Sequence, residues 1–223
     1  MGGQLSEISI KVLPSNIAKQ YTVANHYMKT FPVAAVSFGV FYQGRLCGVL
    51  SFGYSTQTAN KVRKHVPNIK DDEFIEMQRM HLDDCLGQNA ESYVLSRCIA
   101  MLREHGIKLI ITHAGGCKND CGIVYQSSAW LYFGKEPCND FYLTDTGEYK
   151  NIVAPRRYGR VPAGLKDPQE IGEALFGPGR IVNSYRYVYL YPVQKGLRSF
   201  LQKTSQPYPK DSEHFRKNQE WVS

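Results

Sequence analysis

A nearly continuous run of apolar and aromatic residues between positions 36 and 52 constrains the fold more than any other segment of this chain. The run is broken once, by Gln43-Gly44-Arg45. A short polar break that contains glycine, placed between two apolar stretches, is typical of a tight turn between antiparallel strands. The segment therefore predicts a β-hairpin from Val36 to Phe52, so the chain must build a sheet.

The rest of the chain alternates between helical and strand-like patterns. Pro14-Ser15-Asn16 begins a predicted helix, since apolar residues recur at helical spacing up to His26. The polar stretch from Ser55 to Asp72 is interpreted as a loop or flap. The later predicted elements are a strand over 75–82, a helix over 90–105, a strand over 107–113, a helix over 122–131 and strands over 141–143 and 185–191. This order predicts an α/β fold with a mixed sheet flanked by helices.

Composition places the chain among ordinary globular proteins. Of its 223 residues 43% are hydrophobic and 21% charged, which excludes disorder, collagen and a coiled coil. No run approaches the roughly 20 apolar residues of a membrane span, and the start lacks the pattern of a secretory signal. Six cysteines are too few for a disulfide scaffold at this length. We therefore expect a soluble cytoplasmic protein with reduced thiols and no membrane partner.

The positive charge lies in the last third of the chain. Residues 150–223 carry 13 basic and 6 acidic residues, which accounts for the whole net charge of +7. We expect one domain over 1–203, containing a basic insertion rich in proline and glycine over 150–183. An extended or disordered tail is expected over 204–223.

Arginines alternate with tyrosines in this basic third, which suits a polyanion. Cations release counterions from phosphates, and aromatic rings stack on bases. A solvated basic face with one tyrosine-rich strand is the alternative interpretation. The predicted nucleic-acid contacts are Arg156, Arg157, Arg160, Arg180 and Arg186.

A second cluster could bind a metal. His113, Cys117 and Cys121 offer imidazole and thiolate ligands, which suit iron, zinc or another divalent metal. Their spacing matches no standard closed zinc site.

Glu76 and Arg79 lie on opposite faces of a predicted strand. One of the two side chains should therefore point to the core or to a cleft. The alternative is that both form ion pairs at the end of the strand.

The strand ending at His113 and the following helix resemble the GCN5-related N-acetyltransferases. In that fold a helix tyrosine four residues before a Gly-Phe pair protonates the departing thiolate, and Tyr125 lies four residues before Ala129-Trp130. The usual glycine motif that holds coenzyme A is replaced by Leu86-Gly87-Gln88-Asn89-Ala90. Tyr125 packing in the core is the alternative to an acid role.

A narrower resemblance is to the Mom family of phage proteins, which modify adenine in DNA to N6-carbamoylmethyladenine and so protect the DNA from restriction. It covers about residues 8–134 and the late tyrosine strand. The matching motifs are Asn25-His26-Tyr27, the hairpin Phe38-Gly39-Val40-Phe41 to Phe52-Gly53, Glu76-Met77-Gln78-Arg79, Asn89-Ala90-Glu91-Ser92, Gly122-Ile123-Val124-Tyr125 and Tyr185-Arg186-Tyr187-Val188-Tyr189.

The resemblance implies a transferase acting on double-stranded DNA, with site residues at the matching positions. One phage relative has an acidic residue where this chain has Gly115, so Asp120 becomes a candidate acid. The implied catalytic residues are His26, Tyr27, Tyr125, Ser127 and Asp120. The implied donor-binding residues are Asn89, Glu91, Ser92 and Arg79. Helix capping is the alternative for His26, Asn89, Glu91 and Ser92.

The product constrains the donor, which is acetyl coenzyme A or an aminoacyl compound. A carbamoylmethyl group contains a nitrogen that an acetyl group lacks, whereas a glycyl group contains the same atoms as carbamoylmethyl. Base flipping would expose N6 of adenine.

Two other functions stay open: a conventional coenzyme A-dependent acetyltransferase of a small amine, and a non-catalytic DNA-binding module. The oligomeric state is undetermined, with a homodimer as one alternative.

Overall fold

The computed structural model describes residues 3–115, 121–153, 155, 159 and 161–210. Its elements in chain order are α1 (Gly3–Ser6), β1 (Ser9–Val12), α2 (Ser15–Asn25), β2 (Val36–Tyr42), β3 (Arg45–Gly53), α3 (Thr56–His65), β4 (Phe74–Leu82), the 3₁₀ helix η1 (Asp84–Leu86), α4 (Ala90–Glu104), β5 (Leu109–Gly115), α5 (Ile123–Ser127), β6 (Leu131–Thr144), β7 (Tyr149–Asn151), α7 (Pro168–Phe176), β8 (Gly179–Pro192) and α8 (Lys195–Gln202).

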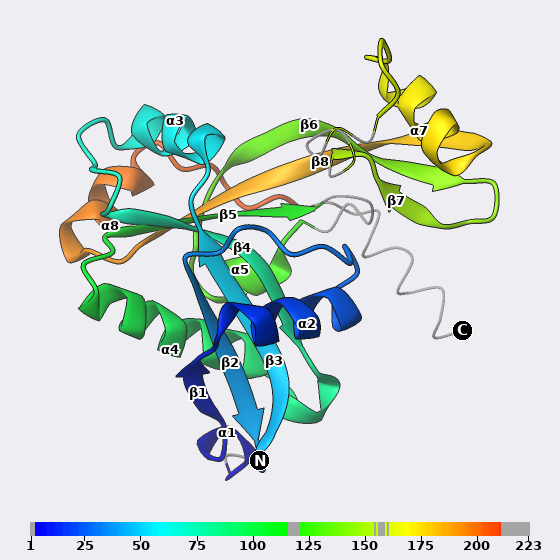
Figure 1. The fold of residues 1–223 in the computed structure, drawn as a ribbon. Coiled ribbons are helices and arrows are strands. Elements are labelled where there is room, and N and C mark those ends of the chain that lie inside the picture. The colour runs from blue at the N-terminus through cyan, green and yellow to red at the C-terminus, as the bar shows by residue number, and fades with distance from the viewer. Residues whose placement is uncertain (1–2, 116–120, 154, 156–158, 160, 211–223) are drawn as a thin grey trace, which may run out of the picture. The chain divides into compact units, whose positions relative to one another are not determined.

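The strands of the described residues form an eight-stranded sheet in the order β1-β2-β3-β4-β5-β8-β6-β7 (Figure 1). Neighbouring strands from β1 to β4 are antiparallel, whereas β4 and β5 are parallel. The predicted α/β fold with a mixed sheet and flanking helices is therefore confirmed.

The residues divide into two compact units. Unit 1 comprises Met1–His113, Ile123–Phe133 and Tyr189–Pro207. Unit 2 comprises Ala114–Gly122, Gly134–Val188 and Tyr208–Ser223. Because β5, β6 and β8 contain residues of both, these strands contribute to each unit. The domain over 1–203 and the tail over 204–223 stay predictions.

The predicted hairpin is confirmed in unit 1 as β2 and β3. Tyr42 pairs with Arg45, and the two residues between them, Gln43 and Gly44, have φ of 50° and 78°. Left-handed conformations at both positions are the geometry of a two-residue turn that matches strand twist. The predicted helices before His26 and over 90–105 are confirmed as α2 and α4, and the apolar stripe of α4 is buried.

The prediction of a loop over 55–72 is wrong for most of the segment, because α3 covers Thr56–His65, whereas residues 66–72 form no helix or strand. Ser55 Oγ accepts a hydrogen bond from Thr58 N and so caps the helix. Of its side chains Thr58 and Val62 are buried. An amphipathic stripe this narrow, in a polar segment, leaves little periodicity in the sequence. The helix predicted over 122–131 is shorter in the structure, since Ala129 has a φ of 59°.

In unit 2, described residues of the segment rich in proline and glycine form regular secondary structure. Residues 150–183 contain α7 and parts of β7 and β8. Asp167 caps α7 by accepting hydrogen bonds from Gln169 N and Glu170 N. The unit has its own apolar core, formed by Tyr142, Ile152 and Ile171 with Val161, Leu165, Leu175, Phe176 and Ile181. Among the described helices, none is long and apolar enough to cross a membrane.

Candidate active site

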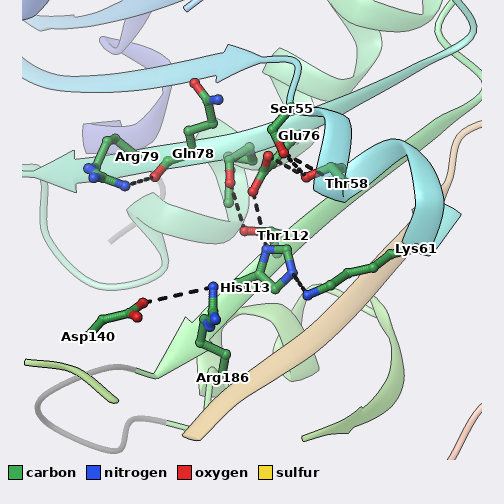
Figure 2. A network of polar contacts seen from close by, with 11 residues as sticks. Ser55, Thr58, Lys61, Glu76, Gln78, Arg79, Thr112, His113, Asp140 and Arg186 are labelled. Carbon is green, nitrogen blue, oxygen red and sulfur yellow. Dashed lines mark hydrogen bonds and ion pairs between the residues drawn. The ribbon is translucent and has the colours of Figure 1, made fainter. Parts of the chain in front are cut away.

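The parallel pairing of β4 and β5 brings Glu76 and His113 together in unit 1. Glu76 pairs with Ile111, and His113 follows two residues later, so both side chains lie on one face of the sheet. His113 Nδ1 lies 3.2 Å from Glu76 Oε1. Both side chains are 15% exposed, so the contact between them is shielded from most of the solvent. Figure 2 shows the pair beneath α3.

Helix α3 supplies the remaining polar partners of this pair. Thr58 Oγ1 donates to Glu76 Oε2 at 2.6 Å, and Ser55 Oγ lies 2.7 Å from Thr58 Oγ1. Lys61 Nζ lies 3.2 Å from His113 Nε2 (Figure 2). Both carboxylate oxygens and both ring nitrogens therefore have partners. We call Ser55, Thr58, Lys61, Glu76 and His113 the Glu76 cluster.

The partners determine where protons lie in the Glu76 cluster. Burial raises the pKa of Glu76, but hydrogen bonds from His113 and Thr58 outweigh it, so the pKa lies below its ordinary value. The carboxylate is ionised at neutral pH, and Nδ1 of His113 carries the hydrogen that it donates. Lys61 Nζ faces Nε2, the other nitrogen of the same ring. An ionised carboxylate beside an imidazole is an arrangement that suits general acid–base chemistry.

A β-bulge in β4, next to the Glu76 cluster, accompanies a buried polar side chain, that of Gln78. Ser51 pairs with Arg79 and Phe52 pairs with Met77, which leaves Gln78 as the extra residue. The buried Gln78 Oε1 has no hydrogen-bond partner among the described residues. A Cβ added at Gly53 would lie 2.7 Å from this oxygen, so the glycine makes room for it. An unsatisfied buried acceptor at this position suits a ligand N–H.

Arg79 is held beside the bulge and not at the surface. Its Nη1 donates to Gln78 O at 2.6 Å, and its Nη2 donates to Thr30 Oγ1 at 3.2 Å. These bonds connect β4 to the segment after α2. The positive charge of Arg79 therefore lies near the segment that carries His26 and Tyr27.

His26 and Tyr27 lie directly after α2. His26 is 7% exposed, its Nδ1 accepts from Met28 N at 3.1 Å, and its ring stacks on Tyr27 at 4.5 Å. Burial, together with Arg79 and His81, lowers the pKa of His26 to about 3. The imidazole is therefore neutral at pH 7 and a weak base. Tyr27 is 53% exposed.

Tyr125 lies in an aromatic cluster of unit 1. Its ring is 5.3 Å from that of Trp130 and 5.4 Å from that of Tyr189, and Tyr125 is 9% exposed. This packing fits the core interpretation, and the acid role stays a prediction. Ser127 is exposed and its Oγ donates to Val124 O at 3.0 Å. Asp120 lies outside the described residues.

The residues predicted to hold the donor surround the start of α4. Asn89 has a φ of 66°, and its side chain, within the described part of the chain, makes no capping hydrogen bond. Ser92 Oγ donates to Asn89 O at 3.1 Å, and Glu91 is exposed. Asn89 therefore occupies the N-cap position of α4 without a side-chain capping bond, and the donor-binding role of the three residues stays a prediction.

The predicted metal and DNA contacts are only partly within the described residues. His113 bonds to Glu76 and Lys61, Cys121 is buried, and Cys117 is not described. Arg180 is exposed, and Arg186 Nη1 lies 3.9 Å from Asp140 Oδ2. Arg156, Arg157 and Arg160 lie outside the described residues. Both predictions remain untested.

Sequence reasoning missed Thr58 and Lys61, because both belong to the helix that was expected to be a loop. It considered His113 as a metal ligand. It expected either Glu76 or Arg79 to point to the core or a cleft, with a strand-end ion pair as the alternative. No local signal joins these residues, since their contact depends on β4 pairing with β5 and on the position of α3.

Comparison with known proteins gives two kinds of similarity. The model of the Mom protein family matches residues 7–210. The methylcarbamoylase Mom of Escherichia phage Mu is 27% identical over 211 residues, which cover 92% of this chain and 84% of that protein. Among solved structures, an agmatine N-acetyltransferase matches with a TM-score of 0.50 and 11% identity, covering 83% of this chain and 99% of that chain. At this identity the structural match shows the fold alone.

Proposed function

Because the chain belongs to the Mom protein family, we propose that it is a transferase that places a carbamoylmethyl group on N6 of adenine in double-stranded DNA. The phage Mu relative bears the name methylcarbamoylase, and similarity to it extends over most of both chains. The single structural observation that carries the proposal is the hydrogen-bonded series from Lys61 through His113 to Glu76. The functional consequence is protection of phage DNA from restriction.

The Glu76 cluster suits an amine acceptor. The lone pair of adenine N6 is delocalised into the ring, so the amine is a poor nucleophile and must lose a proton as it reacts. In the proposed reaction His113 Nε2 takes this proton, and the ionised Glu76 stabilises the resulting imidazolium. Lys61 moves from Nε2 to let the amine approach. The contact with Glu76 already orients the imidazole, so the movement of Lys61 is the rearrangement that this step requires.

Gln78 suits the group that is transferred. A carbamoyl group ends in an NH₂, which donates hydrogen bonds, and the buried Gln78 Oε1 is an acceptor without a partner among the described residues. We therefore assign Gln78 to binding of the carbamoyl NH₂ or of the donor amine. An acetyl group has no such donor, so this contact would select a nitrogen-containing donor over an acetyl donor.

The other predicted residues take supporting roles. Asn89, Ser92 and Glu91 at the start of α4 would hold the donor, with the backbone N–H groups of the first turn facing its anionic part. Tyr125 would protonate the leaving group. Tyr27, with its exposed ring stacked on His26, would support a flipped adenine, and the neutral His26 would hydrogen-bond to it.

The test is mass spectrometry of nucleosides from bacteria that express the chain. We expect N6-carbamoylmethyladenine with the wild-type protein, and about 10²- to 10⁴-fold less with His113→Gln. His105→Gln is the matched control, since His105 is exposed at the end of α4. Full modification by a folded His113→Gln variant would contradict the assignment of the base.

Isotope labelling separates the donors and the competing functions. Carbon and nitrogen of labelled glycine should both enter the product if an aminoacyl donor is used, whereas labelled acetate identifies an acetyl donor. N6-acetyladenine, or acetylation of a small amine alone, would indicate a conventional acetyltransferase. DNA binding without any modified nucleoside would indicate a binding module.

Unit 2 would contact the DNA backbone through the predicted arginines. Arg180 is exposed on β8, whereas Arg186 has an acidic neighbour, Asp140. Replacing Arg156, Arg157 and Arg160 together should reduce the slope of log affinity against log salt by roughly 0.9 for each lost phosphate contact. An unchanged slope would remove these residues from the interface.

A further inference from the structure

A second polar cluster of unit 1, at the other end of β4, has the composition of a metal site. Its potential ligands are Cys47 of β3, Asp83 after β4 and Cys85 of η1, and their ligand atoms all lie within 4.8 Å of one another. We propose that these three side chains bind a divalent ion of the zinc class. We call them, with Tyr21, Arg45 and His81, the Asp83 cluster.

The ligand geometry is close to what zinc requires. Zinc lies about 2.3 Å from thiolate sulfur and about 2.0–2.2 Å from carboxylate oxygen, so its ligands are roughly 3.4–3.8 Å apart in a tetrahedron. The ligand atoms lie within 4.8 Å of one another, so rotation of the Asp83 carboxylate and the Cys85 thiol would have to close the remaining distance. The backbone already holds two ligands in register, because Asp83 N donates to Cys47 O at 2.7 Å. Cys85 is exposed, which gives an ion a route from solvent.

A fourth ligand is within reach. His81 Nε2 lies 3.4 Å from Asp83 Oδ1, and a neutral imidazole is a common zinc ligand. His81 is not among the three residues whose ligand atoms all lie within 4.8 Å of one another, so it would have to rotate to complete the set. The set would then contain two thiolates, one carboxylate and one imidazole.

The other members of the Asp83 cluster orient these ligands and compensate their negative charge. Tyr21 OH donates to Asp83 Oδ1 at 2.7 Å, as an outer partner of a ligating carboxylate does. Arg45 Nε and Nη2 lie 3.4 Å from the sulfur atoms of Cys47 and Cys85, where N–H donors stabilise thiolates. Two thiolates and a carboxylate exceed the charge of Zn²⁺ by one, and Arg45 supplies the balancing positive charge. Both thiol protons leave to solvent on binding.

The bound ion would stabilise unit 1. Cys47 belongs to β3 and Cys85 to η1, while Tyr21 connects the cluster to α2, which precedes His26. A bound ion would therefore hold three segments together next to the residues predicted to handle the adenine. The site is structural, since its proposed ligands come from the protein alone.

The test is titration of the reduced, metal-free full chain with Co²⁺, read by the sulfur-to-cobalt charge-transfer absorption, followed by displacement with Zn²⁺. We expect one ion per chain, a charge-transfer band that Zn²⁺ removes, and loss of the band in Cys85→Ser and in Asp83→Asn. Tyr21→Phe should weaken binding about 10- to 100-fold. Circular dichroism of each variant verifies the fold, and Cys85→Ser is informative because this side chain is exposed.

Cys121→Ser is the matched control, because Cys121 is the described thiol of the His113, Cys117 and Cys121 set. It should keep the band. Absence of a band in the wild-type protein, or an equal band in folded Cys85→Ser, would overturn the proposal. Loss of the band in Cys121→Ser with retention in Cys85→Ser would overturn it in favour of the other cysteines.

Discussion

Glu76 and Asp83 lie toward opposite ends of β4, and their surroundings contain the same kinds of side chain. Each carboxylate is next to a histidine and receives a hydrogen bond from a helix hydroxyl, Thr58 for Glu76 and Tyr21 for Asp83. Each cluster also contains one cation, Lys61 or Arg45. Similar components therefore occur twice along one strand.

The two clusters differ in the solvent exposure of the carboxylate and in the presence of cysteine thiols. Glu76 is 15% exposed and its partners are oxygen and nitrogen groups, whereas Asp83 is 31% exposed and lies beside two thiols. A buried carboxylate with an oriented imidazole suits proton transfer. A partly exposed carboxylate with thiols suits a soft metal ion. Solvent exposure and the two cysteines therefore separate the proposed structural site at Asp83 from the proposed catalytic site at Glu76.

The largest expected effect comes from removing the charge of Glu76. Glu76→Gln leaves His113 without an anionic partner, so the imidazolium formed during the reaction is no longer stabilised. We expect adenine modification to fall about 10²- to 10⁴-fold, measured by nucleoside mass spectrometry. Glu104→Gln, an exposed change in α4, should modify adenine like wild type. Equal activity of a folded Glu76→Gln protein would remove the functional distinction between the clusters.

His26 supplies the next largest effect, through pH. Because the pKa of His26 is about 3 in the folded chain and near 6.5 when unfolded, the unfolded state binds more protons between these values. Stability is fully present above about pH 6.5 and is lost on acidification, by up to about 1.4 kcal/mol per pH unit. Urea unfolding at pH 7, 6 and 5 should show this slope.

His26→Gln should flatten the slope, while His105→Gln should keep it. The quantity to compare is the slope of the free energy of unfolding against pH, because either substitution can alter the stability at pH 7 for other reasons. An unchanged slope in His26→Gln would mean that His26 takes up its proton as easily in the folded chain as in the unfolded one.

The two hydroxyl donors allow a direct comparison of the clusters. Thr58 is 2% exposed and Glu76 is largely buried, so Thr58→Val should cost about 1.5–3 kcal/mol, the range for a hydrogen bond to a charged group. Tyr21→Phe should cost less, about 0.5–1.5 kcal/mol, because water can reach Asp83. Chemical denaturation measures both. A larger cost for Tyr21→Phe would reverse the order of burial inferred for the two carboxylates.

The smallest expected effect concerns the cap of α3. Ser55→Ala removes the bond from Thr58 N and should destabilise the protein by about 1 kcal/mol. Activity should fall as well, since α3 carries Thr58 and Lys61. Ser96→Ala, on the exposed face of α4, is the control and should change stability by no more than about 0.5 kcal/mol. Equal stability of both variants would show that α3 is held by packing alone.

Local patterns made much of the fold predictable. The hairpin of β2 and β3, the helix α4 with its buried stripe and the strand β4 were expected at nearly their observed bounds. These elements depend on contacts between residues close in the sequence, so apolar periodicity and turn residues determine them. The motifs around His26, Glu76, Asn89 and Tyr125 likewise indicate the family by their residue types and their order along the chain.

Helix α3 and the folded part of unit 2 were harder to predict. In α3 most positions are polar, and the buried Thr58 and Val62 acquire meaning only when the helix covers the sheet. In residues 150–183 prolines and glycines obscured α7, although Asp167 and Pro168 form a regular helix start. Gly172 fits there because a Cβ would lie 2.0 Å from the Tyr142 ring.

The sequence by itself determined the secondary structure of the core, the family and the residue types available for chemistry. Only the tertiary structure decided which of them meet. Glu76 contacts His113 because β4 pairs in parallel with β5. Asp83 meets Cys47 because β3 begins beside the end of its antiparallel neighbour β4. Strand register and helix placement bring together residues far apart in the chain, and such contacts depend on the packing of the whole core, which no local pattern encodes.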